Sequence, residues 1–467
     1  MSREKTFAKN VFVIALGVFL PKLTNIILLP VITAGLTKAE YGTYDLISIL
    51  VSLLLPIATL QIQSSVFRFL IDSRDNRIEA KCIVTNAVVF GTTLSSLSFS
   101  ILFFVLHRLE LGIRLLICLY FFTDALLSIA RQIVRGFSNN KLYSLASTLQ
   151  ALVNTLFAVI TVSFWKQGLK GALLSMFAAS LFSLLLLFLK GNIIENIDFS
   201  SISLKTLKKM LHYSWPMIPN QLSSWILSAS DRMILTTFMG LEATAVYAAA
   251  YKIPSLLTAL QSTFTFAWQE SASLASKDND REKYYSDMFD TMFCIMAGLL
   301  GLLIAATPVL FRILIRGDYK DSYPQMPILF LGMLFSSLSS YMGGIYIAFK
   351  KTASVGLTTA FAAALNLLID FALVNKIGIY AASLSTLLSY FVWLLYRMID
   401  VQKFQRVHFR FKKILFQLIL LLIMCVCCWL NNLYTNILNF IIACTSMIFF
   451  NRKIIRAILI GVRKRIK

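Results

Sequence analysis

The sequence predicts an all-α, polytopic membrane protein. Of its 467 residues, 58% are hydrophobic and only 14% are charged, and the mean hydropathy of +0.75 lies well above that of soluble domains. Apolar runs of about 20 residues, the length that crosses a hydrocarbon core of roughly 30 Å, recur along the chain between short polar breaks. These runs must be helices, because only a helix satisfies its backbone hydrogen bonds internally in lipid.

The chain contains about fourteen such runs, each a candidate membrane span. The first run is longer than the core of a signal peptide and is followed by further runs, so we expect it to be retained. The loops between spans are short and leave no room for a separate catalytic domain. The predicted spans cover residues 8–33, 43–66, 82–106, 113–135, 142–164, 169–189, 213–238, 243–268, 288–311, 325–348, 352–374, 378–396, 412–430 and 433–450.

Basic residues are concentrated on one side of this topology. The net charge is +22, and the richest stretches of Lys and Arg, 68–81, 205–209, 397–413 and 452–467, all fall on that side. The asymmetry is the positive-inside pattern and predicts cytoplasmic N- and C-termini. Attraction to anionic lipid explains the charge without a nucleic-acid partner. A role for some of these residues in gathering an anionic substrate is the alternative.

No metal site or cofactor is predicted. The seven cysteines lie in or beside apolar spans without the spacing of zinc ligands, so we interpret them as small hydrophobic residues. The three histidines lie far apart at span ends. The sequence also lacks a phosphate-binding loop and the common catalytic signatures, which favours transport over enzymatic chemistry.

A weak internal repeat relates two halves of the chain at an offset of roughly 205 residues. A long apolar helix, a Gly-Leu exit and a Tyr that opens the next span occur near residues 25–45 and again near 231–252. An even number of spans separates the copies, as in a parallel repeat around a central cavity. We therefore expect six-helix lobes at residues 1–200 and 201–400, followed by two additional helices and a basic tail at 401–467.

Polar residues inside the predicted spans form stripes on helical faces. A charge at the bilayer centre costs at least about 2.5 to 3.5 kcal/mol on insertion scales, so such residues are candidates for function. Asp45, Asp124 and Asp231, in spans 2, 4 and 7, are candidates for carrying a coupling proton or for ion pairs. Further polar residues that we expect to line the cavity are Asn25, Ser48, Ser52, Gln221, Ser224, Ser228 and Ser255.

A purely structural role is the alternative for these residues. Ion pairs such as Lys22 with Asp45, or Asp231 with Lys252, would lock helices together. Asp370 lies near the predicted outer end of span 11, so we expect it to reach the membrane interface and leave it out of the site.

Prolines fall in the spans that carry the polar stripes. Pro56 lies in span 2, Pro216 and Pro219 open span 7, and Pro254 lies in span 8. Each proline removes a helix hydrogen bond and favours a bend. These bends would either serve moving helices or simply shape the cavity.

Four short motifs resemble those of one transporter family. They are Glu40–Tyr44 (EYGTY), Pro216–Pro219 (PMIP), Ser230–Leu235 (SDRMIL) and Tyr247–Lys252 (YAAAYK). With the span pattern, they resemble the polysaccharide (O-antigen type) flippases of the MOP exporter superfamily, which also holds the MATE drug exporters and the lipid II flippases. The resemblance implies two six-helix lobes around a cavity lined by spans 1, 2, 7 and 8, plus two C-terminal helices.

The same resemblance implies a substrate. An undecaprenyl-diphosphate-linked oligosaccharide would cross the bacterial cytoplasmic (inner) membrane by alternating access, for O-antigen or capsule biosynthesis, alongside a polysaccharide polymerase and chain-length machinery. Cations of the cavity would bind the diphosphate. These substrate-binding candidates are Lys22, Arg68, Arg131, Arg135, Arg232 and Lys252. The mixed cavity charges leave a MATE-like exporter of drugs or small molecules and a polytopic polysaccharide polymerase as alternatives.

Overall fold

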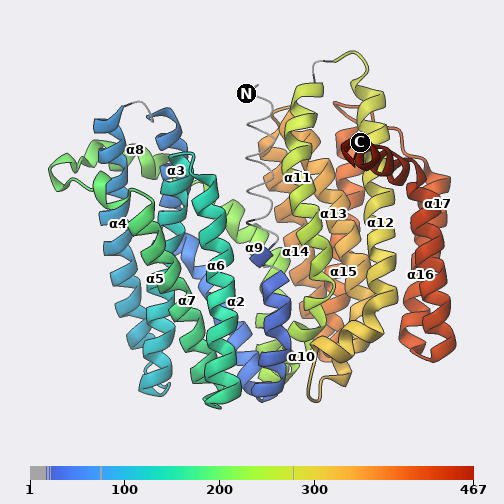
Figure 1. Cartoon of the computed structure of the whole chain (residues 1–467), viewed down its shortest axis with the longest axis horizontal. Helices are drawn as coiled ribbons and strands as arrows, with labels where there is room; N and C mark the ends of the chain where they lie inside the picture. The colour runs from blue at the N-terminus through green and yellow to red at the C-terminus, as the bar shows by residue number, and fades with distance from the viewer. Residues whose placement is uncertain (1–16, 18–19, 22, 74–75, 277, 467) are drawn as a thin grey trace. The chain divides into compact units, whose positions relative to one another are not determined.

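The structure, a computed structural model, describes residues 17, 20–21, 23–73, 76–276 and 278–466 (Figure 1). All regular structure within these ranges is helical. Eleven of the described helices are long and apolar enough to cross a membrane, and a shorter apolar helix covers Leu23–Gly35. The predicted all-α, polytopic membrane class is therefore confirmed.

The chain divides into two compact units, Met1–Ala229 and Ser230–Lys467, and the division falls inside helix α9. The first unit is a bundle of long helices joined by short connections. Its elements are α2 (Lys38–Ala58), α3 (Ile62–Asp72), α4 (Arg77–Val105), α5 (Leu111–Gly136), α6 (Asn140–Ala158), the π-helical turn η1 (Val159–Phe164), α7 (Gly168–Lys190), η2 (Ile194–Asn196), η3 (Phe199–Ser201), α8 (Leu204–Ser214) and the first part of α9 (Met217–Met239).

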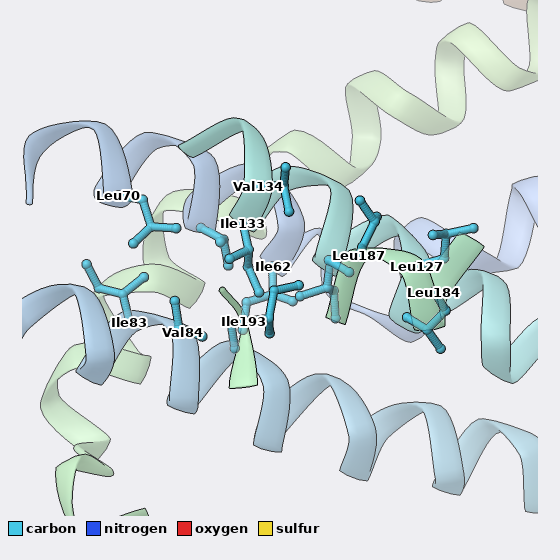
Figure 2. Packing of buried hydrophobic residues seen from close by; sticks show 14 of the residues in the cluster. Ile62, Leu70, Ile83, Val84, Leu127, Ile133, Val134, Leu184, Leu187 and Ile193 are labelled. Atoms are coloured by element: carbon cyan, nitrogen blue, oxygen red, sulfur yellow. The ribbon is translucent and has the colours of Figure 1, made fainter. Parts of the chain in front are cut away.

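The hydrophobic core of the first unit lies where α3, α4, α5, α7 and α8 meet (Figure 2). Ile62, Val84, Ile133 and Leu187 are fully buried there and come from four different helices. Close packing of branched aliphatic side chains leaves few voids, and truncating one of them typically costs about 2 to 5 kcal/mol. This core fixes the position of α5, which carries several of the predicted polar residues.

The second unit completes α9 and is built around α13. The apolar length of α13 is mostly buried, and it packs against α11, α12 and α15. The elements of this unit are α10 (Leu241–Lys252), α11 (Ser255–Ala275), α12 (Arg281–Leu314), η4 (Lys320–Gln325), α13 (Met326–Ala348), α14 (Thr352–Ile377), α15 (Tyr380–Val401), α16 (Phe411–Leu430) and α17 (Leu433–Ile466).

Two predicted spans are broken helices. Predicted span 8 divides into α10 and α11 at Ile253 and Pro254. Predicted span 2 divides into α2 and α3, with Leu60 and Gln61 at φ of 47° and 54°, just after Pro56. Proline removes a backbone donor and clashes with the preceding turn, which explains a break just after Pro56 and another at Pro254. Discontinuous helices of this kind are typical of transporter binding sites.

Candidate functional site

A group of buried polar side chains surrounds Asp231 in the second unit. Asp231 lies on α9 and is only 3% exposed. Its Oδ2 atom accepts hydrogen bonds from the Tyr247 hydroxyl at 2.8 Å and from the Thr386 hydroxyl at 2.7 Å. Tyr247 comes from α10 and Thr386 from α15, so three helices meet at one carboxylate oxygen.

A second carboxylate, Asp370 of α14, lies close to the first. It is completely buried, and neither of its oxygens has a hydrogen-bond partner among the described residues. Asp231 is the charged group that acts on it electrostatically. Two buried carboxylates at short range repel each other strongly when both are ionised. A proton or a bound cation removes that repulsion.

Neutral oxygen atoms complete the surroundings of this carboxylate pair. Asn366 lies one helical turn before Asp370 on α14, next to Asp231, and its Oδ1 accepts from the Ser230 hydroxyl at 3.3 Å. The Ala382 carbonyl accepts from Tyr247 at 3.4 Å. Carboxylate, amide, hydroxyl and carbonyl oxygens are ligands for hard cations. Within the described part of the chain no group of three or more His, Cys, Asp or Glu residues is gathered for a metal ion.

Arg232 is the cation next to this pair. It is 7% exposed, and its guanidinium lies over the ring of Tyr251, with 4.7 Å to the centroid, and farther from that of Tyr247, at 5.8 Å. It also acts electrostatically on Asp231. Arg232 thus balances part of the carboxylate charge from a buried position.

A second polar group lies in the first unit. Asp124 and Arg131 lie about two turns apart on α5 and interact electrostatically. Arg131 donates to the Gln150 side chain of α6. One turn further on, the Arg135 guanidinium lies 4.5 Å from the ring centroid of Phe67. This helix face therefore presents two arginines held by neighbouring side chains.

The remaining predicted residues lie on several other helices. Asp45 is buried on α2, and Arg68 makes an exposed ion pair of 2.5 Å with Asp72. Ser52 accepts a 3.1 Å hydrogen bond from the Trp225 indole. Lys22 lies outside the described residues. Asn25, Gln221, Ser224 and Ser228 are exposed, whereas Ser48, Lys252 and Ser255 are half-buried.

The sequence reasoning missed Asp370, Asn366, Thr386 and Tyr247. The structure buries Asp370 completely, about two turns before the end of α14, so its side chain does not reach the protein surface. Its charge within an apolar span was the available signal, reinforced by the polar Asn366 four residues earlier on the same helical face. Tyr247 and Thr386 belong to the group because they donate hydrogen bonds to Asp231, and no local sequence pattern predicts these tertiary contacts.

Sequence comparison relates the chain to polysaccharide biosynthesis. The model of the polysaccharide biosynthesis protein family matches residues 7–272, more than half of the chain. A curated relative, an uncharacterized membrane protein of Methanocaldococcus jannaschii, is 23% identical over 318 residues, which cover 63% of this chain. The chain spans 62% of the length of that relative.

Solved structures with a similar fold are transporters. An inward-facing multidrug resistance MATE family transporter of the MOP superfamily aligns with a TM-score of 0.69 and 13% identity, over 82% of this chain and 95% of its own. A MATE transporter from Vibrio cholerae aligns with a TM-score of 0.62 and 13% identity, over 86% of this chain and 98% of its own. A MOP superfamily transporter from Pyrococcus furiosus aligns with a TM-score of 0.59 and 14% identity, over 85% of this chain and 95% of its own. At such identities the likeness shows the fold alone. The chain belongs to the polysaccharide biosynthesis protein family and has the fold of the MOP superfamily transporters.

Proposed function

We propose that this protein moves a polyprenyl-diphosphate-linked oligosaccharide across the bacterial cytoplasmic membrane by alternating access, coupled to a proton or Na⁺ at the Asp231–Asp370 pair. Membership of the polysaccharide biosynthesis family supports the substrate class, and the fold supports transport. The observation that carries the coupling is the buried Asp370 carboxylate, whose oxygens have no hydrogen-bond partner among the described residues.

The substrate poses a physical problem that arginines can solve. Taking an oligosaccharide and a diphosphate out of water costs several kcal/mol for each polar group left unpaired. Arg131 and Arg135 lie one turn apart on α5, a spacing that supports the pairing of both guanidinium groups with neighbouring phosphates. Gln150 contacts the Arg131 side chain and Phe67 contacts the Arg135 side chain. Arginine suits this role because its planar fork binds phosphate oxygens bidentately.

Cation binding at the carboxylate pair offers a means of coupling. Its oxygen atoms come from α9, α10, α14 and α15, so a bound cation favours the conformation in which these helices are packed together. A ligand shifts a conformational equilibrium only by its difference in affinity for the two states. Release of the cation would restore the repulsion between Asp231 and Asp370 and favour the other state.

The biological role is tested in a deletion strain of the source organism. We expect lipid-linked repeat units to accumulate in the inner leaflet and surface polysaccharide to fall, with rescue by the wild-type gene. Unchanged export of the repeat units would contradict the oligosaccharide assignment. Increased sensitivity to drugs with normal surface polysaccharide would instead support a MATE-like exporter.

The cation site is tested on the purified protein by thermal unfolding. At constant ionic strength, Na⁺ replaces choline in one series and the pH is lowered in another. We expect at least one of the two to raise the Tm of the wild type and of Asp321→Asn, which removes an exposed carboxylate of η4. Asp370→Asn should lose that response. A ligand at 100 times its Kd adds about 2.7 kcal/mol to stability, which is easily measured. The same response from Asp370→Asn and wild type would contradict the site.

A further inference from the structure

Helices α12, α16 and α17 of the second unit pack against one another (Figure 1). A separate cavity lies between them. Its volume of about 560 Å³ lies within the usual range of sites for small ligands. Acidic residues of α12, basic residues at the start of α16 and the aromatic pair Phe449 and Phe450 of α17 line it. None of these residues belongs to the Asp231–Asp370 site.

The acidic residues of this cavity are already paired. Arg410, at the start of α16, contacts Asp287 at 3.0 Å through Nη2 and Asp290 at 2.9 Å through Nε. Asp290 is 5% exposed, and its charge acts mainly on Arg410 and also on Lys413. The Arg410 guanidinium thus forms ion pairs with both carboxylates.

Two further cations line the cavity. The side chains of Lys413 on α16 and Arg452 on α17 make no ion pair and no hydrogen bond with another described residue, although Lys413 acts electrostatically on Asp290. The lining carries three cations, Arg410, Lys413 and Arg452, against the two carboxylates, so it keeps a positive excess that attracts an anion. Phosphate oxygens match this arrangement, because they accept charge-assisted hydrogen bonds from both Lys and Arg.

The apolar wall of the cavity identifies the source of the phosphate. Phe449 is 65% exposed and Phe450 stacks edge-on against it, with 5.1 Å between ring centroids. Phe416 and Ile448 continue this exposed apolar surface along α16 and α17, both of which are candidate membrane spans. A free phosphate ion would gain nothing from these rings, whereas a lipid presents a phosphate and acyl chains together.

We propose that this cavity binds the headgroup phosphate of an anionic phospholipid through Lys413 and Arg452, with its acyl chains along Phe449 and Phe416. The lipid would hold the helix pair α16–α17 against α12. The basic residues place the site on the cytoplasmic side of the predicted topology, where anionic lipid attracts Lys and Arg. This inference does not depend on which substrate is transported.

Native mass spectrometry of the full-length protein with added phosphatidylglycerol or phosphatidylcholine tests the proposal. The variant Lys413→Gln/Arg452→Gln removes both cavity cations. The variant Arg406→Gln/Lys412→Gln removes the same charge from exposed positions beside them and serves as the matched control. Each cation near an anionic lipid contributes roughly fivefold in affinity, so we expect the cavity variant to lose phosphatidylglycerol binding about 25-fold. The control should lose clearly less affinity, because neither of its cations lines the cavity.

Three results would overturn the proposal. Equal losses in both variants would mean that general charge attraction holds the lipid. Equal retention of phosphatidylcholine and phosphatidylglycerol by the wild type would exclude a site for an anionic headgroup. Displacement of bound phosphatidylglycerol by millimolar inorganic phosphate would assign the cavity to a free anion. Circular dichroism of both variants confirms that the helices are intact before binding is compared.

Discussion

Thr386 on α15 donates a 2.7 Å hydrogen bond to Asp231 on α9. The same carboxylate oxygen accepts a 2.8 Å hydrogen bond from Tyr247 on α10. These two donors fix the orientation of Asp231 next to Asn366 and Asp370 of α14. A site assembled from four helices is sensitive to any change in how they pack, as a coupling site must be.

Replacing Thr386 by Val removes one of the two donors while keeping the side-chain shape. Hydrogen bonds to charged groups contribute about 1.5 to 3 kcal/mol, so we expect the free energy of unfolding to fall by that amount. The response of the Tm to the coupling cation should also weaken. Thermal unfolding in detergent, with and without the cation, measures both effects.

Ser385→Ala is the matched control for this variant. The Ser385 hydroxyl is equally buried on α15 but donates only to the Ala382 carbonyl of its own helix, at 3.0 Å. We expect a loss below about 1 kcal/mol, because a neutral hydrogen bond contributes less than a charged one. Equal losses of unfolding free energy in Thr386→Val and Ser385→Ala would show that the hydrogen bond from Thr386 to Asp231 contributes no more than a neutral one.

Removing the paired arginines of the first unit should reduce transport without unfolding the protein. We expect Arg131→Gln/Arg135→Gln to lower surface polysaccharide at least tenfold in a complemented deletion strain, because diphosphate binding loses two charge-assisted contacts. Lys141→Gln, which removes an exposed cation at the start of α6, is the control and should complement normally. Full complementation by the double variant, at normal expression, would exclude both arginines from the substrate site.

We expect a large fall in the free energy of unfolding when the Arg397 side chain is removed. It is 2% exposed on α15 and donates to the Ser339 and Val355 carbonyls and to Thr358 and Thr359, at 2.8 to 3.2 Å. Arg397→Met leaves these buried acceptors without a donor and should cost more than about 3 kcal/mol. Arg397→Lys should retain only part of the lost stability, because an ammonium group cannot reproduce the planar set of donors of a guanidinium.

Thermal unfolding of the two Arg397 variants, beside Arg406→Gln at an exposed position, measures this loss. A Tm for Arg397→Met within about 2 °C of the wild type would contradict a role in holding α13, α14 and α15 together.

Much of the fold could be predicted from the sequence, because lipid imposes a simple rule on composition. Apolar runs of sufficient length must become helices, and eleven such helices are present among the described residues. The prolines Pro56 and Pro254 also mark where α2 and α10 give way to a second helix. These features depend on local sequence alone.

The candidate site could be predicted only in part. Asp231 and Arg232 stand out as charges within a predicted span, and the structure brings both into the buried group. The predicted span ends at residue 374 and favours an interfacial position for Asp370, whereas α14 extends to Ile377 and the side chain is completely buried by neighbouring helices. The contribution of Thr386 depends on how α15 packs against α9, which no periodicity in a single helix encodes.

Reconstitution into liposomes tests the central claim most directly. Purified protein is incorporated with a polyprenyl-diphosphate-linked oligosaccharide, and the glycan that reaches the opposite leaflet is measured with a membrane-impermeant glycosidase. We expect the wild type and Asp321→Asn to move the glycan, faster when a proton or Na⁺ gradient is imposed, and Asp370→Asn to show no acceleration by either gradient. No glycan movement by folded wild-type protein, or equal acceleration of Asp370→Asn and wild type, would contradict this account.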